Sequence, residues 1–297
     1  MKTAWIAAAA LLLASTAAHA NHYSDFYVIP VASHTPGQNN TMWMSDIAIQ
    51  NFQSTALTVQ LSVIESGDSN LSDNVFPLVA GDVNGSVTVP ANGSLLLTDV
   101  LNGYRGMTSS SGAILIGADR PFTVTSRSYN QAPNGTVGQS VPAARDFLEN
   151  TVGRTDLSTS VVYLPGLKNN DRYRTNLGMV IGNAGSSGPL TIQITLRNAA
   201  GDSIATKSVT VTGGAFTHMQ FPLSSITDRT FEIGSATVRI AEGNGAVLPY
   251  ASVIDNRTAD AVFITTEFPD STPFLRDAST SMFRQLLDRM RTTTTDR

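Results

Sequence analysis

Residues 57–63 read Leu57-Thr58-Val59-Gln60-Leu61-Ser62-Val63, and residues 190–196 repeat the pattern as Leu190-Thr191-Ile192-Gln193-Ile194-Thr195-Leu196. Apolar and polar residues alternate in both stretches, which is typical of a half-buried β-strand. A second element recurs unchanged, first as Ser86-Val87-Thr88-Val89 and then as Ser208-Val209-Thr210-Val211. Because these elements return in the same order at a nearly constant offset, they indicate a tandem duplication of one folding unit.

Further alternating segments surround both repeats. The first copy places Trp43, Ser45, Ile47 and Ile49 on one face, and the second copy places Tyr173, Leu177, Met179 and Ile181 there. Trp43 and Tyr173 occupy equivalent positions, so we expect both to be packing anchors. Each copy has about seven short strands separated by turn residues, which is the pattern of an immunoglobulin-like sandwich.

The sequence therefore predicts an all-β fold with two tandem immunoglobulin-like β-sandwich domains and a short C-terminal helix. The predicted divisions are a signal peptide over 1–20, the first domain over 21–145, a linker over 146–159, the second domain over 160–270 and a tail over 271–297. Near the linker, 144–148 could form one helical turn. Residues 281–291 show apolar residues at helical spacing, so this helix either docks on the second domain or binds a partner.

The first 20 residues favour export. Lys2 precedes the apolar stretch 6–13, and Ala18-His19-Ala20 forms an Ala-x-Ala cleavage site. We expect a bacterial protein that is secreted or resides in the periplasm or cell envelope. The chain has no cysteine, which excludes disulfides and thiol catalysis, and its net charge of −4 argues against nucleic acid as a partner. No later apolar run is long enough for a transmembrane segment.

Catalytic motifs are absent from the sequence. It contains neither His-Glu-x-x-His nor Gly-x-Ser-x-Gly, and a Ser-His-Asp arrangement would have to use His22, His34 or His218. The carboxylate pairs Asp255 with Asp260 and Glu65 with Asp68 could serve a glycosidase only if they faced one cleft. We therefore predict no enzyme, no catalytic residue and no cofactor.

One loop carries candidate calcium ligands. Asp68, Asn70 and Asp73 supply oxygen ligands there, but the loop lacks the glycine and the distal glutamate of an EF-hand. We predict no metal site and leave calcium open.

The segment 122–131 is the best candidate for a contact surface. If Phe122 and Val124 face the core, then Arg127 and Tyr129 lie together on the opposite face. Arginine and tyrosine are enriched at binding hot spots, so Arg127, Tyr129 and Asn130 are the predicted binding residues. The alternative is structural: Tyr129 packs over a sheet edge and Arg127 pairs with Asp46 or a neighbouring carboxylate.

Three groups of residues carry a family resemblance, namely 43–47, then 126–130 with 138–143, and then 173–177 with 255–258. Over about residues 26–268, the chain resembles a β-sandwich repeat of many poorly characterised exported bacterial proteins, in which the repeat often follows a protease or another catalytic domain. The resemblance implies an extracellular or envelope-associated accessory module and supplies no catalytic residue.

These observations predict an exported non-enzymatic structural or interaction protein that acts in adhesion, surface assembly or binding. Its partner could be a protein or a surface polysaccharide. Two copies of a weak site would add avidity if the linker let both copies bind one repetitive target. Two alternatives stay open: a secreted hydrolase with an unrecognised site, and a fibre subunit that self-associates through an exposed edge strand.

Overall fold

The computed structural model describes residues 24–37, 41–67, 75–77, 85–132, 135–145, 152–155, 158–159, 161–182, 188–211 and 216–266. These residues form an all-β protein of antiparallel sheets. Three predicted features lie outside them: the signal peptide 1–20, the loop with Asp68, Asn70 and Asp73, and the helix 281–291.

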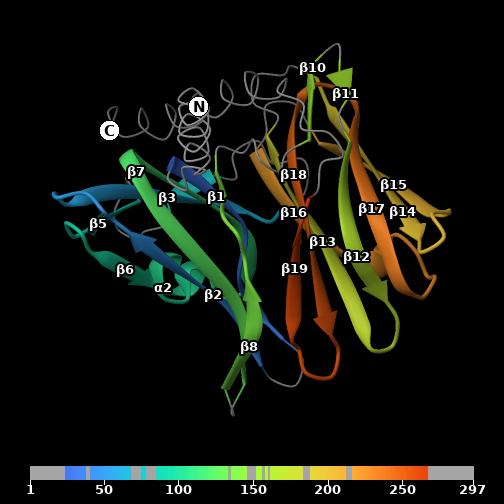
Figure 1. Cartoon of the computed structure of the whole chain (residues 1–297), viewed down its shortest axis with the longest axis horizontal. Helices are drawn as coiled ribbons and strands as arrows, with labels where there is room; N and C mark the ends of the chain where they lie inside the picture. Colours follow the sequence, from blue (N-terminus) through green and yellow to red (C-terminus); the bar gives the residue numbers. More distant parts are fainter. Residues whose placement is uncertain are drawn as a thin grey trace, which may run out of the picture.

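The N-terminal half, residues 24–145, is one nine-stranded sheet with the path β4-β3-β7-β1-β2-β6. Strand β5 adds to β3, β8 adds to β7 and β9 adds to β1. Figure 1 shows this half in blue and green. Its elements are β1 (Ser24–Pro36), β2 (Met42–Gln50), β3 (Leu57–Glu65), β4 (Val75–Pro77), β5 (Ser86–Val89), β6 (Ser94–Leu97), α2 (Val100–Arg105), β7 (Ser110–Ala132), β8 (Gly135–Ser140) and β9 (Ala144–Arg145).

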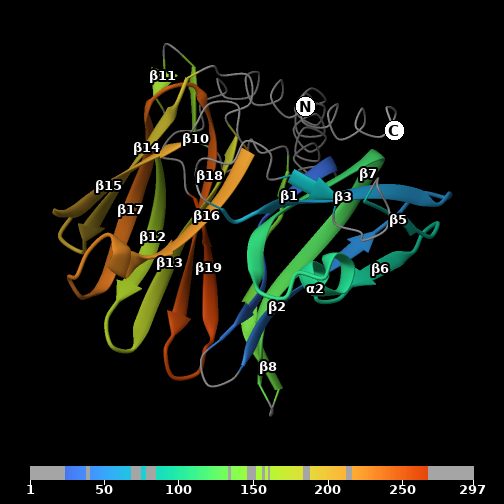
Figure 2. The ribbon, with the colours of Figure 1, turned by 180° about the vertical axis from the view of Figure 1, so that it is seen from behind.

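The C-terminal half, residues 152–265, has two sheets. The inner sheet follows the order β11-β10-β18-β13-β16 with β19 on β18, and the outer sheet follows β12-β17-β14-β15. Figure 2 shows the inner sheet between the N-terminal half and the outer sheet. The elements are β10 (Val152–Thr155), β11 (Ser158–Thr159), β12 (Val161–Asn169), β13 (Tyr173–Gly182), β14 (Leu190–Asn198), β15 (Ser203–Val211), β16 (Phe216–Pro222), the 3-10 helix η3 (Leu223–Ser225), β17 (Phe231–Glu242), β18 (Gly245–Asp255) and β19 (Ala261–Thr265).

The sequence repeat corresponds to a repeat of strand pairing. Strand β3 pairs with β5 and β7, and β14 pairs with β15 and β17. The registers match at each repeated position: Leu57–Val89 corresponds to Leu190–Val211, Val59–Val87 to Ile192–Val209, and Leu61–Ile116 to Ile194–Val238. Equivalent residues therefore have equivalent neighbours.

Each half has its own buried apolar cluster, which confirms the inward assignment of the repeated strands. The apolar positions of both strands are fully buried: Leu57, Val59, Leu61 and Val63 in β3, and Leu190, Ile192, Ile194 and Leu196 in β14. Burial of each such side chain stabilises the fold by roughly 1.5–3 kcal/mol. These alternating strands therefore contribute to the stability of both halves.

Strand β7 differs from the sequence-based expectation. The apolar segments 113–116 and 122–129 predict two separate strands, but the structure has one strand of 23 residues over both. Residues 112–118 pair with β3, whereas residues 123–131 pair with β2. Pro121, which has no N–H to donate, falls between these two stretches. The change of partner therefore occurs without a break in the strand.

Two short elements also differ from expectation. Ala144 and Arg145 were predicted to begin a helical turn, but they form strand β9, in which Ala144 pairs with Val28 and is buried. Helix α2 was not predicted; it buries Val100 and Leu101 and ends at Gly106, where φ is 71°. In both places the burial of apolar residues decides the local structure.

Candidate functional site

The two halves share a third buried cluster, and we call their contact region the seam. The N-terminal half contributes Phe26, Val28, Ile64, Ala113, Leu115 and Ala144, and the inner sheet contributes Val180, Phe216, Ala246 and Leu248. The inner sheet therefore packs on both faces, since Leu177, Met179 and Ile181 belong to the cluster shared with the outer sheet. The halves are held together by this core as well as by the chain between them.

A polar network lies within the seam. His218 on β16 is fully buried, and its Nε2 lies 2.7 Å from the Tyr250 hydroxyl. Its Nδ1 bonds the Ser66 hydroxyl, whose oxygen lies 2.8 Å from that of Ser111. The Tyr250 ring lies across Gly178, where an added Cβ would come within 2.0 Å of the ring. Burial lowers the pKa of His218 to about 3, so its imidazole is neutral at physiological pH.

The Ser66–His218 pair has the composition of a nucleophile and its base, but its setting does not suit hydrolysis. Both ring nitrogens of His218 are engaged, and the second partner is the Tyr250 hydroxyl rather than a carboxylate. The imidazole has no exposed surface, so a substrate cannot reach it. This network satisfies buried polar groups at the seam.

The other side chains considered for catalysis bond to partners other than His218 among the described residues. His34 Nδ1 lies 2.8 Å from Asp99 Oδ1. Asp255 Oδ1 accepts the backbone N–H of Arg257, and the Arg172 guanidinium donates to Oδ2 at 3.2 Å; these bonds hold the pKa of Asp255 below its usual value. Asp255 thus stabilises the turn that leads to β19. Glu65 accepts a hydrogen bond from the Ser110 hydroxyl at 3.0 Å, while Asp68 lies outside the described residues.

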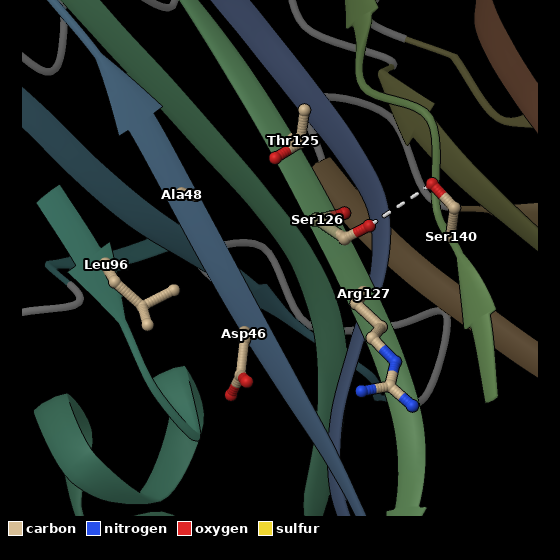
Figure 3. A pocket seen from close by; sticks show the side chains of 7 residues that line it. All are labelled: Asp46, Ala48, Leu96, Thr125, Ser126, Arg127 and Ser140. Atoms are coloured by element: carbon tan, nitrogen blue, oxygen red, sulfur yellow. Dashed lines mark hydrogen bonds between the residues drawn. The ribbon is translucent and has the colours of Figure 1, made fainter. Parts of the chain in front are cut away.

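The predicted contact residue Arg127 lies on the solvent-facing side of β7, beside a shallow pocket of about 410 Å³. Figure 3 shows the seven residues that line it, and we call this surface the hollow face: Asp46, Ala48, Leu96, Thr125, Ser126, Arg127 and Ser140. The neighbouring strands β6, β2, β7 and β8 build this surface. Cross-strand pairing places Leu96, Ala48 and Thr125 in one row, and it places Asp46, Arg127 and Ser140 in a second row. A rigid sheet therefore fixes these positions.

Arg127 and Tyr129 lie together, as the strand period predicts. The Arg127 guanidinium is 4.9 Å from the centre of the Tyr129 ring, and its Nη2 donates to Thr136 Oγ1 at 2.8 Å. The Tyr129 hydroxyl donates to Asp46 Oδ1 at 3.2 Å, and burial together with Asp46 raises the pKa of Tyr129 to about 12. Asp46 is the cross-strand neighbour of Arg127, but among the described residues no ion pair joins them. The Tyr129 ring and the Thr136 hydroxyl thus orient the Arg127 side chain.

Asn130 lies on the other side of the strand from Arg127 and Tyr129. It is 1% exposed, and neither its Nδ2 nor its Oδ1 has a hydrogen-bond partner among the described residues. Its amide lies behind Gly37, where an added Cβ would be 2.8 Å from Asn130 Nδ2 and 3.3 Å from Trp43 Cδ1. The structure therefore brings Arg127 and Tyr129 together and places Asn130 on the seam side.

A second pocket, which we call the seam pocket, also has a volume of about 410 Å³. The N-terminal half contributes Ser33, Trp43 and Gln139 among others, and the inner sheet contributes Arg174, Asn176 and Gln220. Ser252 donates to Gln139 Oε1 at 3.0 Å across the seam. Trp43 is half-buried and faces this pocket, so it is not a core anchor.

The seam pocket could not be predicted from the sequence, because its lining comes from strands of both halves. One signal was present: Ser128, which lines the pocket, and Asn130 are polar at inward positions of β7, where a core strand would be apolar. Among the described residues, no helix has the length and apolar character needed to cross a bilayer.

No protein-family model matches this chain, and no curated protein is significantly similar to it. Solved structures that match include two with a weak likeness. The structure of the Gt strain of infectious bursal disease virus has 12% sequence identity and a TM-score of 0.22, covering 92% of this chain and 86% of that chain. The structure of the Gx strain has 11% identity and a TM-score of 0.22, covering 90% and 83%. A likeness of this size does not assign the chain to a family.

Proposed function

We propose that the protein is an exported, non-enzymatic interaction protein of a bacterial envelope or surface, built from two immunoglobulin-like units, and that it binds a protein partner through the hollow face. The observation that carries this proposal is the exposed Arg127, whose guanidinium is held over the Tyr129 ring and bonded to Thr136. A side chain that is already oriented loses less conformational entropy on binding. Adhesion or surface assembly would use such a contact.

The chemistry of the hollow face indicates what it would bind. Leu96 is 58% exposed at one end of the face, and Arg127 offers a positive charge at the other. Thr125 on β7 and Ser140 on β8 add hydroxyl groups beside Arg127. The matching partner is a protein segment that presents an apolar side chain together with a carboxylate.

Replacing Arg127 with alanine is expected to weaken partner binding roughly 30-fold or more, the loss typical of a hot-spot residue. The partner is first captured with a photo-crosslinking amino acid at the exposed Thr125, using the mature protein in its native envelope. The exposed Thr210 of the outer sheet carries the same crosslinker as a control. Binding of the captured partner is then titrated with the wild type, Arg127→Ala and Arg239→Ala.

Arg239 is a matched control, because it is also an exposed arginine within a strand and bonds Gln193 Oε1 at 2.8 Å. We expect Arg239→Ala to bind as the wild type does. Equal crosslinking from Thr125 and Thr210, or equal affinity of the two arginine variants, would reject the hollow face as the contact site.

A second copy of this chain is the second candidate partner, because β6 ends the strand path of the N-terminal sheet and carries the exposed Leu96. If β6 mediates self-association, the mature protein should form dimers or longer assemblies as its concentration rises. Leu96→Lys should keep it monomeric. Sedimentation equilibrium measures both, and a wild type that stays monomeric at high concentration contradicts this candidate.

A further inference from the structure

The seam pocket is a separate binding site candidate, because its lining differs in chemistry from the hollow face. Amide and hydroxyl groups dominate it, including Asn176, Gln220, Gln139 and Ser33. The half-buried Trp43 adds an aromatic surface, and Arg174 adds a positive charge, the only charge among the described lining residues. Its volume of about 410 Å³ falls within the roughly 300–1,000 Å³ of small-molecule sites.

Arg174 is a half-buried cation with no carboxylate partner among the described residues. Its Nη1 donates to the neutral Asn256 Oδ1 at 2.6 Å. Burial lowers the pKa of the guanidinium, but arginine remains protonated at neutral pH. The planar guanidinium carries five N–H donors, a geometry suited to the two oxygens of a carboxylate.

Asn130 supplies an independent observation at the same place. Its side chain is almost fully buried behind the wall formed by Gly37 and Trp43, and both amide atoms lack a partner among the described residues. Buried polar groups are normally hydrogen-bonded, so an unpartnered amide beside a polar pocket indicates a missing ligand or water. The wall of the pocket thus contains an amide whose hydrogen-bonding groups no described residue satisfies.

We propose that the seam pocket binds a short carboxylated saccharide. The carboxylate lies against Arg174, the hydroxyl groups bond Asn176, Gln139 and Gln220, and a sugar ring lies on Trp43. The site exists only where the two halves meet, so it belongs to the whole chain and to neither copy of the repeat. It is independent of the hollow face, which lies on the other side of β7.

Calorimetric titration of the mature protein tests the proposal with a galacturonic acid dimer and with the galactose dimer of the same linkage. We expect the acidic dimer to bind and the neutral dimer to bind at least 10-fold more weakly. Arg174→Gln should weaken binding of the acidic dimer roughly 10-fold to 100-fold, the effect of one charge-assisted contact. Arg239→Gln, on the outer sheet, should leave binding unchanged.

A thermal melt of each variant separates loss of binding from loss of folding. If Arg174→Gln is destabilised, Asn176→Ala serves as the second variant, with a smaller expected loss of affinity. No binding of the acidic dimer, or equal binding of the two dimers, overturns the proposal. Tighter binding of inorganic phosphate also overturns it, because the pocket would then suit a phosphate ligand. Arg127→Ala should not change saccharide binding, so failure here and failure at the hollow face are distinguishable.

Discussion

Val211→Asp is expected to unfold the C-terminal half. Val211 is fully buried in the cluster between the inner and outer sheets and pairs with Leu190 on β14. An aspartate there either buries an unpaired charge or forces the strand out of the sheet, and both cost free energy. We expect a loss of about 4 kcal/mol or more, enough to lower the melting temperature by about 10 °C or to prevent folding.

Two variants make this result specific. Thr210→Asp introduces the same residue at the adjacent exposed position and should melt as the wild type does. Val89→Asp changes the equivalent position of the first copy, which is also fully buried and pairs with Leu57. Val89→Asp should lower the free energy of unfolding as much as Val211→Asp does. If circular dichroism melts of Val211→Asp match those of Thr210→Asp, the inward assignment of β15 is wrong.

Acidification is expected to destabilise the protein through His218. The pKa of His218 is lowered to about 3 by burial, whereas an unfolded histidine titrates near 6.5. Between these values the unfolded chain binds a proton that the folded protein does not, so stability falls as the pH decreases from 6.5 toward 3. The loss over this window is on the order of 4 kcal/mol.

Urea unfolding at several pH values measures this effect. His218→Gln is expected to be less stable than the wild type at pH 7, because it disrupts the bonds to Ser66 and Tyr250. Its stability should nevertheless depend less on pH, because the buried imidazole is gone. His34→Gln keeps the seam intact and controls for the loss of a histidine. Carboxylates titrate in every variant, so the difference between variants in the slope of unfolding free energy against pH isolates the contribution of His218. Parallel pH profiles for the wild type and His218→Gln would show that His218 does not cause the acid destabilisation.

The strand pattern could be predicted from sequence because the repeated strands alternate strictly. Residues 57–63 and 190–196 fix which side chains point inward, and the unchanged Ser-Val-Thr-Val segments fix the partner strands. The same period placed Arg127 and Tyr129 on one face. It also places Asn130 on the opposite face, so the three predicted residues could not form one surface.

The seam could not be predicted from either copy alone, because it depends on contacts between distant segments. One signal was nevertheless available in β18. From Ala246 to Ala251 its residues are apolar or aromatic without alternation, which is typical of a strand buried on both faces. Such a strand needs a second covering layer, and here the N-terminal half provides it through Phe26, Val28 and Leu115.

The shared core has a consequence for proteolysis. A cut between β9 and β10 would break the covalent connection but would leave Val28 and Leu115 packed against Val180 and Leu248. The two fragments should therefore stay associated after cleavage and co-purify. Expressed separately, each fragment would expose the apolar surface that the other normally covers, so the fragments should need each other to remain in solution.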